Sequence, residues 1–275
     1  MPTFSHDGIE FHFRSAGEGV PFVFQHGLGA DGSQTFGLFT PPPGLRLLTL
    51  DCRAHGETHP VGDEAKLNVA TFADDVRALL DHLGIERAVI GGISMGAATA
   101  LHFALTHPDR TLGLVLSRPA WLDERRTSGF EAFAVIAGFL RRYGPVEGAA
   151  RFQELPEFVR LAASSPDNAQ SMLGQFAAPR ALEQVAKLER IPQHQPSFTR
   201  ADWRRIAVPT LVLGNRQDAI HPFDYAEAYA REIPGAQLVE LTPKSVSKER
   251  HTSDTAEALG SFLKQWLPPE RGVTT

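Results

Sequence analysis

Short apolar runs alternate with amphipathic segments along most of the chain. Continuous apolar runs bounded by turn residues are typical of strands that are buried on both faces of a parallel sheet. Residues 9–16 instead alternate apolar and polar side chains, which indicates a half-buried antiparallel strand. Buried strands are predicted at residues 20–25, 45–50, 87–91, 111–117 and 209–214, and a last strand at 237–241.

Helical periodicity fills the gaps between these strands. Phe72, Val76, Leu79 and Leu83 recur at the spacing of one helix face, and Gly84 is a typical helix stop. Because strands and helices alternate, we predict an α/β fold with a mainly parallel, doubly wound sheet. Further helices are predicted at residues 97–105, 223–233 and 252–266, followed by a loose tail at 268–275.

The pattern changes between residues 122 and 200, where helical periodicity dominates. We therefore predict a helical insertion at 122–200 within a core that is made of residues 1–121 and 201–275. Prolines interrupt helices because they lack a backbone N–H, so the insertion should consist of short helices. The interrupting residues are Pro145, Pro156, Pro166, Pro179 and Pro192.

The composition is that of an ordinary globular protein, with 42% apolar and 21% charged residues. A net charge of −5 that is spread along the chain argues against a nucleic-acid partner. No apolar stretch reaches the roughly 18 residues of a membrane span, and the start lacks a signal-peptide pattern. We therefore expect a cytoplasmic protein without a membrane partner. Cys52, the single cysteine, has no base paired with it in any motif and is predicted to be a small buried residue.

The segment 92–96, with the sequence Gly-Ile-Ser-Met-Gly, joins a predicted strand to a predicted helix. A strand, a sharp turn and a helix form the context of a nucleophile elbow, in which the serine hydroxyl is lifted above the sheet. Ser94 should then have a positive φ and lie at a helix N-terminus, where partial positive charge favours an oxyanion. The alternative is a Gly-rich turn with an idle serine.

Three further features accompany this elbow. A Gly-rich loop at 26–29 follows an early strand, an acid loop at 214–222 follows a later strand, and His251 follows the last strand. Together with the Asp-Cys-Arg-Ala-His-Gly segment at 51–56, these motifs resemble those of the α/β-hydrolase fold superfamily. Two departures are local: Ala54 stands where glycine is usual, and Arg250 rather than glycine precedes His251.

The resemblance implies an eight-stranded, mainly parallel sheet with the insertion as an α-helical cap. It implies Ser94, Asp218 and His251 as a catalytic triad, and the backbone amides of Leu28 and Met95 as an oxyanion hole. A serine hydroxyl is a weak nucleophile that needs a base within hydrogen-bond reach, and histidine can accept and return a proton near neutrality. No cofactor is implied.

Competing candidates remain for several of these roles. Asp123 could replace Asp218 as the acid, although only Asp218 sits in the matching motif. Asp51, His55 and His59 could be drawn as a metal site, but no ligand spacing supports them, so we expect no metal.

Substrate-binding candidates lie around the expected site. They are His26, Arg118, Trp121, Phe133 and His221. His26 is interpreted foremost as a brace of the oxyanion loop, and His221 as an entrance or a surface residue. Arg118 could bind a substrate carboxylate, although pairing with a neighbouring acid is the favoured interpretation. The aromatic residues of the cap could roof a pocket or form the core of the cap itself.

The expected function is hydrolysis of a small carboxylic ester or lactone through an acyl-enzyme. The Ser-Met-Gly elbow resembles those of enol-lactonases and of cofactor-free haloperoxidase-like esterases. A serine at the elbow disfavours haloalkane dehalogenase and epoxide hydrolase chemistry, whose family members use aspartate there. Hydrolysis of a C–C bond in a vinylogous diketone, hydrolysis of an amide, and non-catalytic binding of a small molecule remain alternatives. The expected partners are a small acyl substrate and, as an open possibility, a second copy of the chain in a homodimer.

Overall fold

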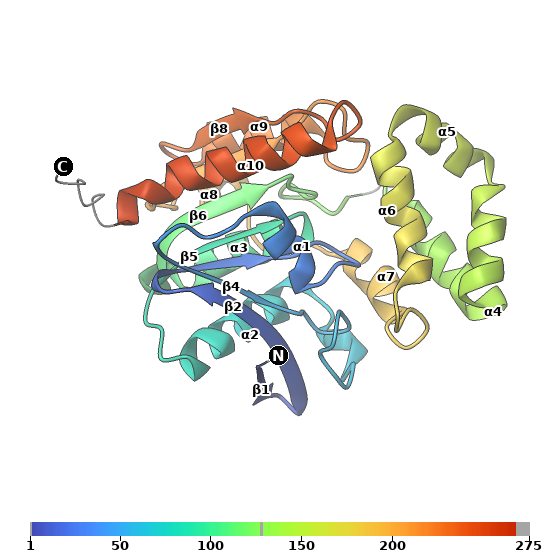
Figure 1. The fold of residues 1–275 in the computed structure, drawn as a ribbon, viewed down its shortest axis with the longest axis horizontal. Coiled ribbons are helices and arrows are strands. Elements are labelled where there is room, and N and C mark those ends of the chain that lie inside the picture. Colours follow the sequence, from blue (N-terminus) through green and yellow to red (C-terminus); the bar gives the residue numbers. More distant parts are fainter. Residues whose placement is uncertain (1, 127–128, 268–275) are drawn as a thin grey trace, which may run out of the picture.

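A computed structural model of the chain describes residues 2–126 and 129–267. Eight strands form one sheet in the order β1-β2-β4-β3-β5-β6-β7-β8 (Figure 1). The pairs β1-β2 and β2-β4 are antiparallel, and all other neighbouring pairs are parallel. The predicted α/β fold with a mainly parallel sheet is confirmed. The strands are β1 (Thr3–His6), β2 (Ile9–Gly17), β3 (Gly19–Gln25), β4 (Gly44–Leu50), β5 (Ala88–Ile93), β6 (Thr111–Ser117), β7 (Thr210–Gly214) and β8 (Gln237–Glu240). The tail predicted at 268–275 lies outside the described residues.

The strand that the sequence pattern missed is β1. It forms a hairpin with β2, in which Thr3 pairs with His12 and His6 with Ile9. The two residues between these strands are Asp7 and Gly8, whose φ angles are 51° and 72°. Two successive positive φ angles define the tight hairpin turn for which Asp-Gly is a preferred sequence. The dipeptide was therefore the signal that could have revealed β1.

Helices cover both faces of the sheet. Ile90 and Leu114 belong to the apolar cluster beneath α2, α3, α8 and α9, whereas Val89 and Val115 belong to the cluster beneath α1 and α10. This alternation explains the continuous apolar runs, because each central strand is buried on both sides. The bounds are α1 (Gly32–Leu38), α2 (Val69–His82), α3 (Met95–Thr106), α8 (Arg200–Trp203), α9 (Phe223–Glu232) and α10 (Lys248–Leu263). Short 3-10 turns are η1 (Glu64–Lys66), η2 (Pro108–Arg110), η3 (Ile191–Gln193) and η4 (Lys264–Trp266).

The helices α4 to α7 connect β6 to α8 and lie beyond one end of the sheet (Figure 1). They fall within residues 122–200, for which the sequence predicts a helical insertion. Prolines begin two of the helices, and the first helix is interrupted at Gly144, where φ is 75°, just before Pro145. The bounds are α4 (Glu131–Gln153), α5 (Pro156–Ser164), α6 (Pro166–Ala177) and α7 (Ala186–Arg190).

Polar contacts hold the insertion against the core. Arg180 donates from Nη1 to the carbonyl oxygens of Gly56 at 3.1 Å and Thr58 at 3.0 Å. Gln184 donates from Nε2 to the same Gly56 oxygen at 3.0 Å. Both donors precede α7, and both acceptors lie in the loop after β4. These contacts add to a buried apolar cluster in which Cys52 and Ala54 of the same loop join Leu188 and Ile191 of the insertion.

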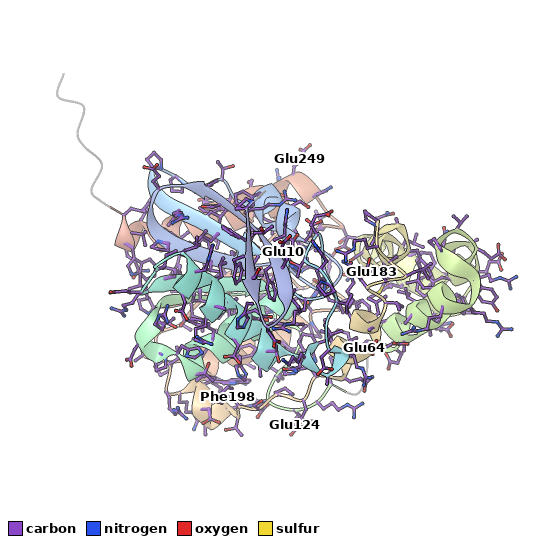
Figure 2. All side chains as sticks on the ribbon, turned by 90° about the horizontal axis from the view of Figure 1, so that it is seen from below. Glu10, Glu64, Glu124, Glu183, Phe198 and Glu249 are labelled. Carbon is purple, nitrogen blue, oxygen red and sulfur yellow. The ribbon has the colours of Figure 1, made fainter. Side chains whose placement is uncertain are left out.

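Charged side chains are distributed over the molecule. The labelled glutamates of Figure 2 lie on separate parts of it, which fits the dispersed charge of the sequence. Among residues 2–126 and 129–267, every helix is too short or too polar to cross a bilayer.

Gly96 provides a test of the packing beneath α3. A Cβ at this position would lie 2.2 Å from the carbonyl oxygen of Gln25, which is a backbone atom that cannot move freely. We expect Gly96→Ala to lower the free energy of unfolding by about 1–3 kcal/mol, as overpacking does in other cores. Urea denaturation measures this change.

The matched control for this test is Gly260→Ala in α10, where a Cβ would have no atom within 4 Å. Alanine there should leave stability unchanged or raise it by about 0.5–1 kcal/mol, because alanine is the better helix former. Equal stability of the two variants would contradict the packing described here.

Candidate active site

Ser94 lies in the one-residue turn between β5 and α3. Its φ of 57° and ψ of −109° confirm the positive φ that the elbow sequence predicts. The turn is tight because a Cβ at Gly92 would lie 2.4 Å from the carbonyl carbon of Gly96. Ser94 therefore sits at the N-terminus of α3, where the helix dipole favours negative charge.

Three neighbouring strands deliver the polar groups around this serine. Ser94 follows β5, Arg118 follows β6, and Asp218 lies in the loop after β7. The strand order β5-β6-β7 brings these carboxyl ends side by side, where ligands of open α/β sheets bind. Backbone hydrogen bonds hold the alignment: Ser94 N donates to Ser117 O at 3.0 Å, and Arg118 N donates to Leu213 O at 2.7 Å.

The histidine that contacts Ser94 is His221. Its Nε2 lies 2.9 Å from Ser94 Oγ, and its Nδ1 lies 3.1 Å from both carboxylate oxygens of Asp218. Because a carboxylate can only accept, Nδ1 carries the proton and Nε2 is free to accept from the serine hydroxyl. Ser94, His221 and Asp218 thus form a hydrogen-bonded chain with the order of groups that a catalytic triad requires.

A local turn explains how His221 reaches Asp218. The Oδ1 atom of Asp218 accepts the backbone N–H groups of Ile220 at 3.1 Å and His221 at 3.0 Å. Such a turn around an aspartate folds the chain back, so the imidazole three residues later lies against the same carboxylate. Pro222 then precedes α9, which begins at Phe223.

The structure does not place His251 where the sequence analysis expected it. The expected loop histidine instead lies in the first turn of α10, because Ser247 caps that helix through Arg250 N and starts it before residue 251. His251 is buried, and its Nδ1 donates to the carbonyl oxygen of Thr242 at 2.8 Å. His221, expected only at the entrance or the surface, takes its place beside Ser94. Its position three residues after the acid was the only sequence signal for this role.

Asp218 is buried among hydrogen-bond donors. Arg118 Nε donates to Oδ2 at 2.7 Å, and Asn168 of α6 donates from Nδ2 to Oδ1 at 3.0 Å. Arg118 therefore pairs with a neighbouring acid, which was the favoured interpretation. The rival acid, Asp123, pairs with Arg200 Nε at 3.0 Å instead. Sequence reasoning missed Asn168, since nothing in a helix pattern tells which polar side chain will meet the core.

The charges of this cluster move two pKa values. Burial raises the pKa of Asp218, but the charges of His221 and Arg118 and the donated hydrogen bonds outweigh it and hold that pKa well below its usual range. Burial lowers the pKa of His221 from its ordinary 6.5, and Asp218 opposes that change only in part. The imidazole is therefore neutral near pH 7, as a general base must be.

The amides proposed for the oxyanion hole lie beside the elbow. Met95 is the first residue of α3, so its N–H has no acceptor within the helix. Within the described residues, the Leu28 N–H also lacks an acceptor. His26 holds this loop, because its Nε2 accepts from Cys52 N at 3.0 Å and its Nδ1 donates to Gly27 O at 2.9 Å. With both nitrogens occupied and the ring fully buried, His26 does not bind substrate directly.

A cavity of about 100 Å³ opens at Ser94. Four of the five expected substrate-binding residues line it, and only His26 does not: Arg118, Trp121, Phe133 and His221. Phe130 also lines the cavity, whereas Phe152, Phe158 and Phe176 pack on one another within the insertion. Some aromatic residues of the insertion thus line the pocket, and others form the core of the insertion itself, which are the two alternatives that the sequence left open. Sequence reasoning missed Lys244, which lines the cavity from the loop after β8.

Known proteins share this architecture. The profile of a family described as alpha/beta hydrolase fold matches residues 20–244. The chain belongs to this family. Within it, the enzyme named 2-hydroxy-6-oxononadienedioate/2-hydroxy-6-oxononatrienedioate hydrolase of Cupriavidus pinatubonensis is 31% identical over 248 residues, covering 84% of this chain and 82% of that protein.

Solved structures extend the comparison to this α/β hydrolase. A thermophilic esterase from Thermogutta terrifontis superposes with a TM-score of 0.73 at 28% identity and covers 97% of both chains. An enol-lactonase from Burkholderia xenovorans superposes with a TM-score of 0.71 at 24% identity, covering 96% of this chain and 100% of that one. The second likeness shows the shared fold.

The lowered pKa of His221 makes a prediction about pH. A base must be neutral to accept a proton, so activity should be retained below pH 6.5 and be lost only as pH falls through the lowered pKa. A profile of kcat/KM against pH on an ester without ionisable groups measures this. An acid limb centred at or above 6.5 would contradict the assignment.

A variant of Arg118 allows a second test with the same profile of kcat/KM against pH. Its positive charge lowers the pKa of His221, so Arg118→Met should move the acid limb to higher pH. Removing one partner of a buried ion pair should also cost about 3–5 kcal/mol of stability. Arg200→Met, which breaks the pair with Asp123, is the control that should leave the pH profile in place.

Proposed function

We propose that this α/β hydrolase is a serine hydrolase that cleaves a small carboxylic ester or lactone. The observation that carries the proposal is the contact of 2.9 Å between His221 Nε2 and Ser94 Oγ, with Asp218 on the other ring nitrogen. A catalytic role explains why a half-buried serine at positive φ faces an imidazole.

The reaction follows from the positions of these groups. His221 takes the proton of Ser94 as its oxygen attacks the substrate carbonyl, and Asp218 stabilises the imidazolium that forms. The amides of Leu28 and Met95 hold the oxyanion. His221 then returns the proton to the leaving oxygen, and water activated by the same imidazole releases the acid from the acyl-enzyme.

The cavity limits the size of the acyl group. Its volume of about 100 Å³ is smaller than the roughly 300–1,000 Å³ of pockets for drug-sized ligands. Trp121, Phe130 and Phe133 give it an apolar wall. A short acyl chain fits this space, with the helical insertion at 122–200 acting as the cap over a core of 1–121 and 201–275. A cytoplasmic location and a homodimer stay predictions from the sequence.

Hydrolysis of a C–C bond is the second candidate. It is favoured by the relatives named 2-hydroxy-6-oxononadienedioate/2-hydroxy-6-oxononatrienedioate hydrolase, which are 31% identical in Cupriavidus pinatubonensis and 29% identical in Comamonas testosteroni. The same serine, histidine and oxyanion groups could serve a vinylogous diketone. Amide hydrolysis and non-catalytic binding have less support, since no described contact favours the first and the aligned triad argues against the second.

The triad assignment is tested by replacing the two histidines. His221→Ala should reduce kcat by about 10⁴-fold or more, as loss of the base does in serine proteases. His251→Asn should reduce it far less, because His251 bonds Thr242 and not Ser94. Labelling by a fluorophosphonate should vanish in Ser94→Ala. The reverse order of the two histidine effects would make His251 the base.

The substrate class is tested by turnover of purified wild-type protein. Short-chain esters, lactones and a vinylogous 1,5-diketone acid should be compared by kcat/KM, each with Ser94→Ala as the blank. Greater turnover of the diketone than of every ester and lactone would transfer the assignment to the second candidate. Absence of turnover on all of them, with no labelling of wild type, would reject a serine hydrolase.

A further inference from the structure

Lys244 and Asp167 both line the cavity at Ser94, and the triad explains the charge of neither. Lys244 lies in the loop between β8 and α10, half-buried, and lines the same cavity as Ser94 and His221. A lysine in this place contributes nothing to the proton transfer described above. Its side chain therefore requires a separate account.

The ammonium group of Lys244 has no polar partner in the described parts of the chain. No hydrogen bond and no ion pair within 4.0 Å joins it to residues 2–126 or 129–267, although its neighbour Arg118 is fully engaged with Asp218. Burial lowers the pKa of Lys244 to about 8, so the group remains mainly cationic near neutrality. A partly desolvated cation without a partner is unfavourable until an anion reaches it.

The neighbouring acids are already engaged. Asp218 accepts hydrogen bonds from Arg118, Asn168 and His221. Asp167 of α6 accepts a hydrogen bond of 3.1 Å from the hydroxyl group of Ser165. The positive charges of Arg118 and Lys248 disfavour the charged form of Lys244. The negative charges of Asp167 and Asp218 favour the charged form from a distance. Asp167 lines the same cavity and has no cationic partner within 4.0 Å among the described residues, but its carboxylate accepts a hydrogen bond, whereas the ammonium of Lys244 has no partner there and is the group left open to an anion.

Several hydrogen bonds hold the loop that carries Lys244, including one of 3.0 Å from Ser245 Oγ to Gln217 Oε1. His251 donates to Thr242 O at 2.8 Å, Asp254 accepts from Thr242 N at 2.8 Å, and Val246 and Ser247 donate to Pro243 O at 3.0 Å and 3.1 Å. A preorganised loop reduces the entropy that is lost on binding. His251, which the reaction does not use, thus serves as a positioning residue for the Lys244 loop.

We propose that Lys244 binds a carboxylate on the substrate, so that the natural substrate is a small acyl compound carrying a second, anionic group. This inference rests on the proposed serine-hydrolase function, because Ser94 must attack the carbonyl at the other end of that substrate. A carboxylate is favoured over a phosphate, because one lysine supplies a single charge and phosphate sites gather several donors. Hydrolysis would then yield a dicarboxylic acid or a hydroxy acid.

The selectivity of the enzyme tests this. Monomethyl succinate and methyl pentanoate have similar size and differ in charge, so the ratio of their kcat/KM values reports recognition of the carboxylate. We expect the wild type to favour the charged ester and Lys244→Met to lower that ratio by about 10–100-fold, mainly through KM. The control Lys248→Met, at an exposed lysine in α10, should keep the ratio. An unchanged ratio in Lys244→Met would overturn the proposal.

A binding experiment separates this proposal from the proposed function. Succinate should raise the melting temperature of Ser94→Ala protein, and the rise should disappear in the Ser94→Ala, Lys244→Met double variant. That result would support the carboxylate site even if no ester were turned over. A rise with inorganic phosphate but none with succinate would overturn the choice of a carboxylate, and an equal rise in both variants would overturn the role of Lys244. Thermal melts without ligand confirm that each variant is folded.

Discussion

The buried carboxylate of Asp218 connects the core to the helical insertion. It accepts from Arg118 after β6, from His221 in its own loop and from Asn168 in α6. A buried charge is stable only when it is paired and hydrogen-bonded. Moving one of these donors away would leave the carboxylate partly unpaired in apolar surroundings, and this unfavourable free energy keeps the donors in place. The orientation of the imidazole, and with it the contact to Ser94, depends on this arrangement.

The sheet converts separate segments of sequence into one site. The elbow, Arg118 and the acid loop follow β5, β6 and β7, whose parallel pairing places their ends on one edge. The insertion leaves the core just after β6, so its first turns and α6 close over that edge. In our proposal the catalytic groups follow strands of the sheet, whereas the wall that selects the substrate comes from the insertion and from Lys244.

The sequence analysis expected His251 to contact both Ser94 and Asp218, but in the structure His221 makes these contacts and His251 makes others. His221 is close in sequence to Asp218 and reaches it through a turn that the carboxylate itself stabilises. His251 stands in family order after the last strand, but the Ser247 cap draws it into α10 and turns its ring toward Thr242. In our proposal it holds the loop from which Lys244 reaches the cavity, so both histidines act on the same site by different means.

The sequence by itself determined the alternation of strands and helices, the run of helices between residues 122 and 200 and the positive φ at Ser94. These features follow from local periodicity, prolines and glycines, which act over a few residues. Asp7 and Gly8 also held a local signal, for β1. The sequence did not determine which histidine meets Ser94, that Asn168 meets Asp218, or that Lys244 lacks a partner. Those contacts join residues far apart in the chain or depend on a side-chain direction, and only the packed tertiary structure decides them.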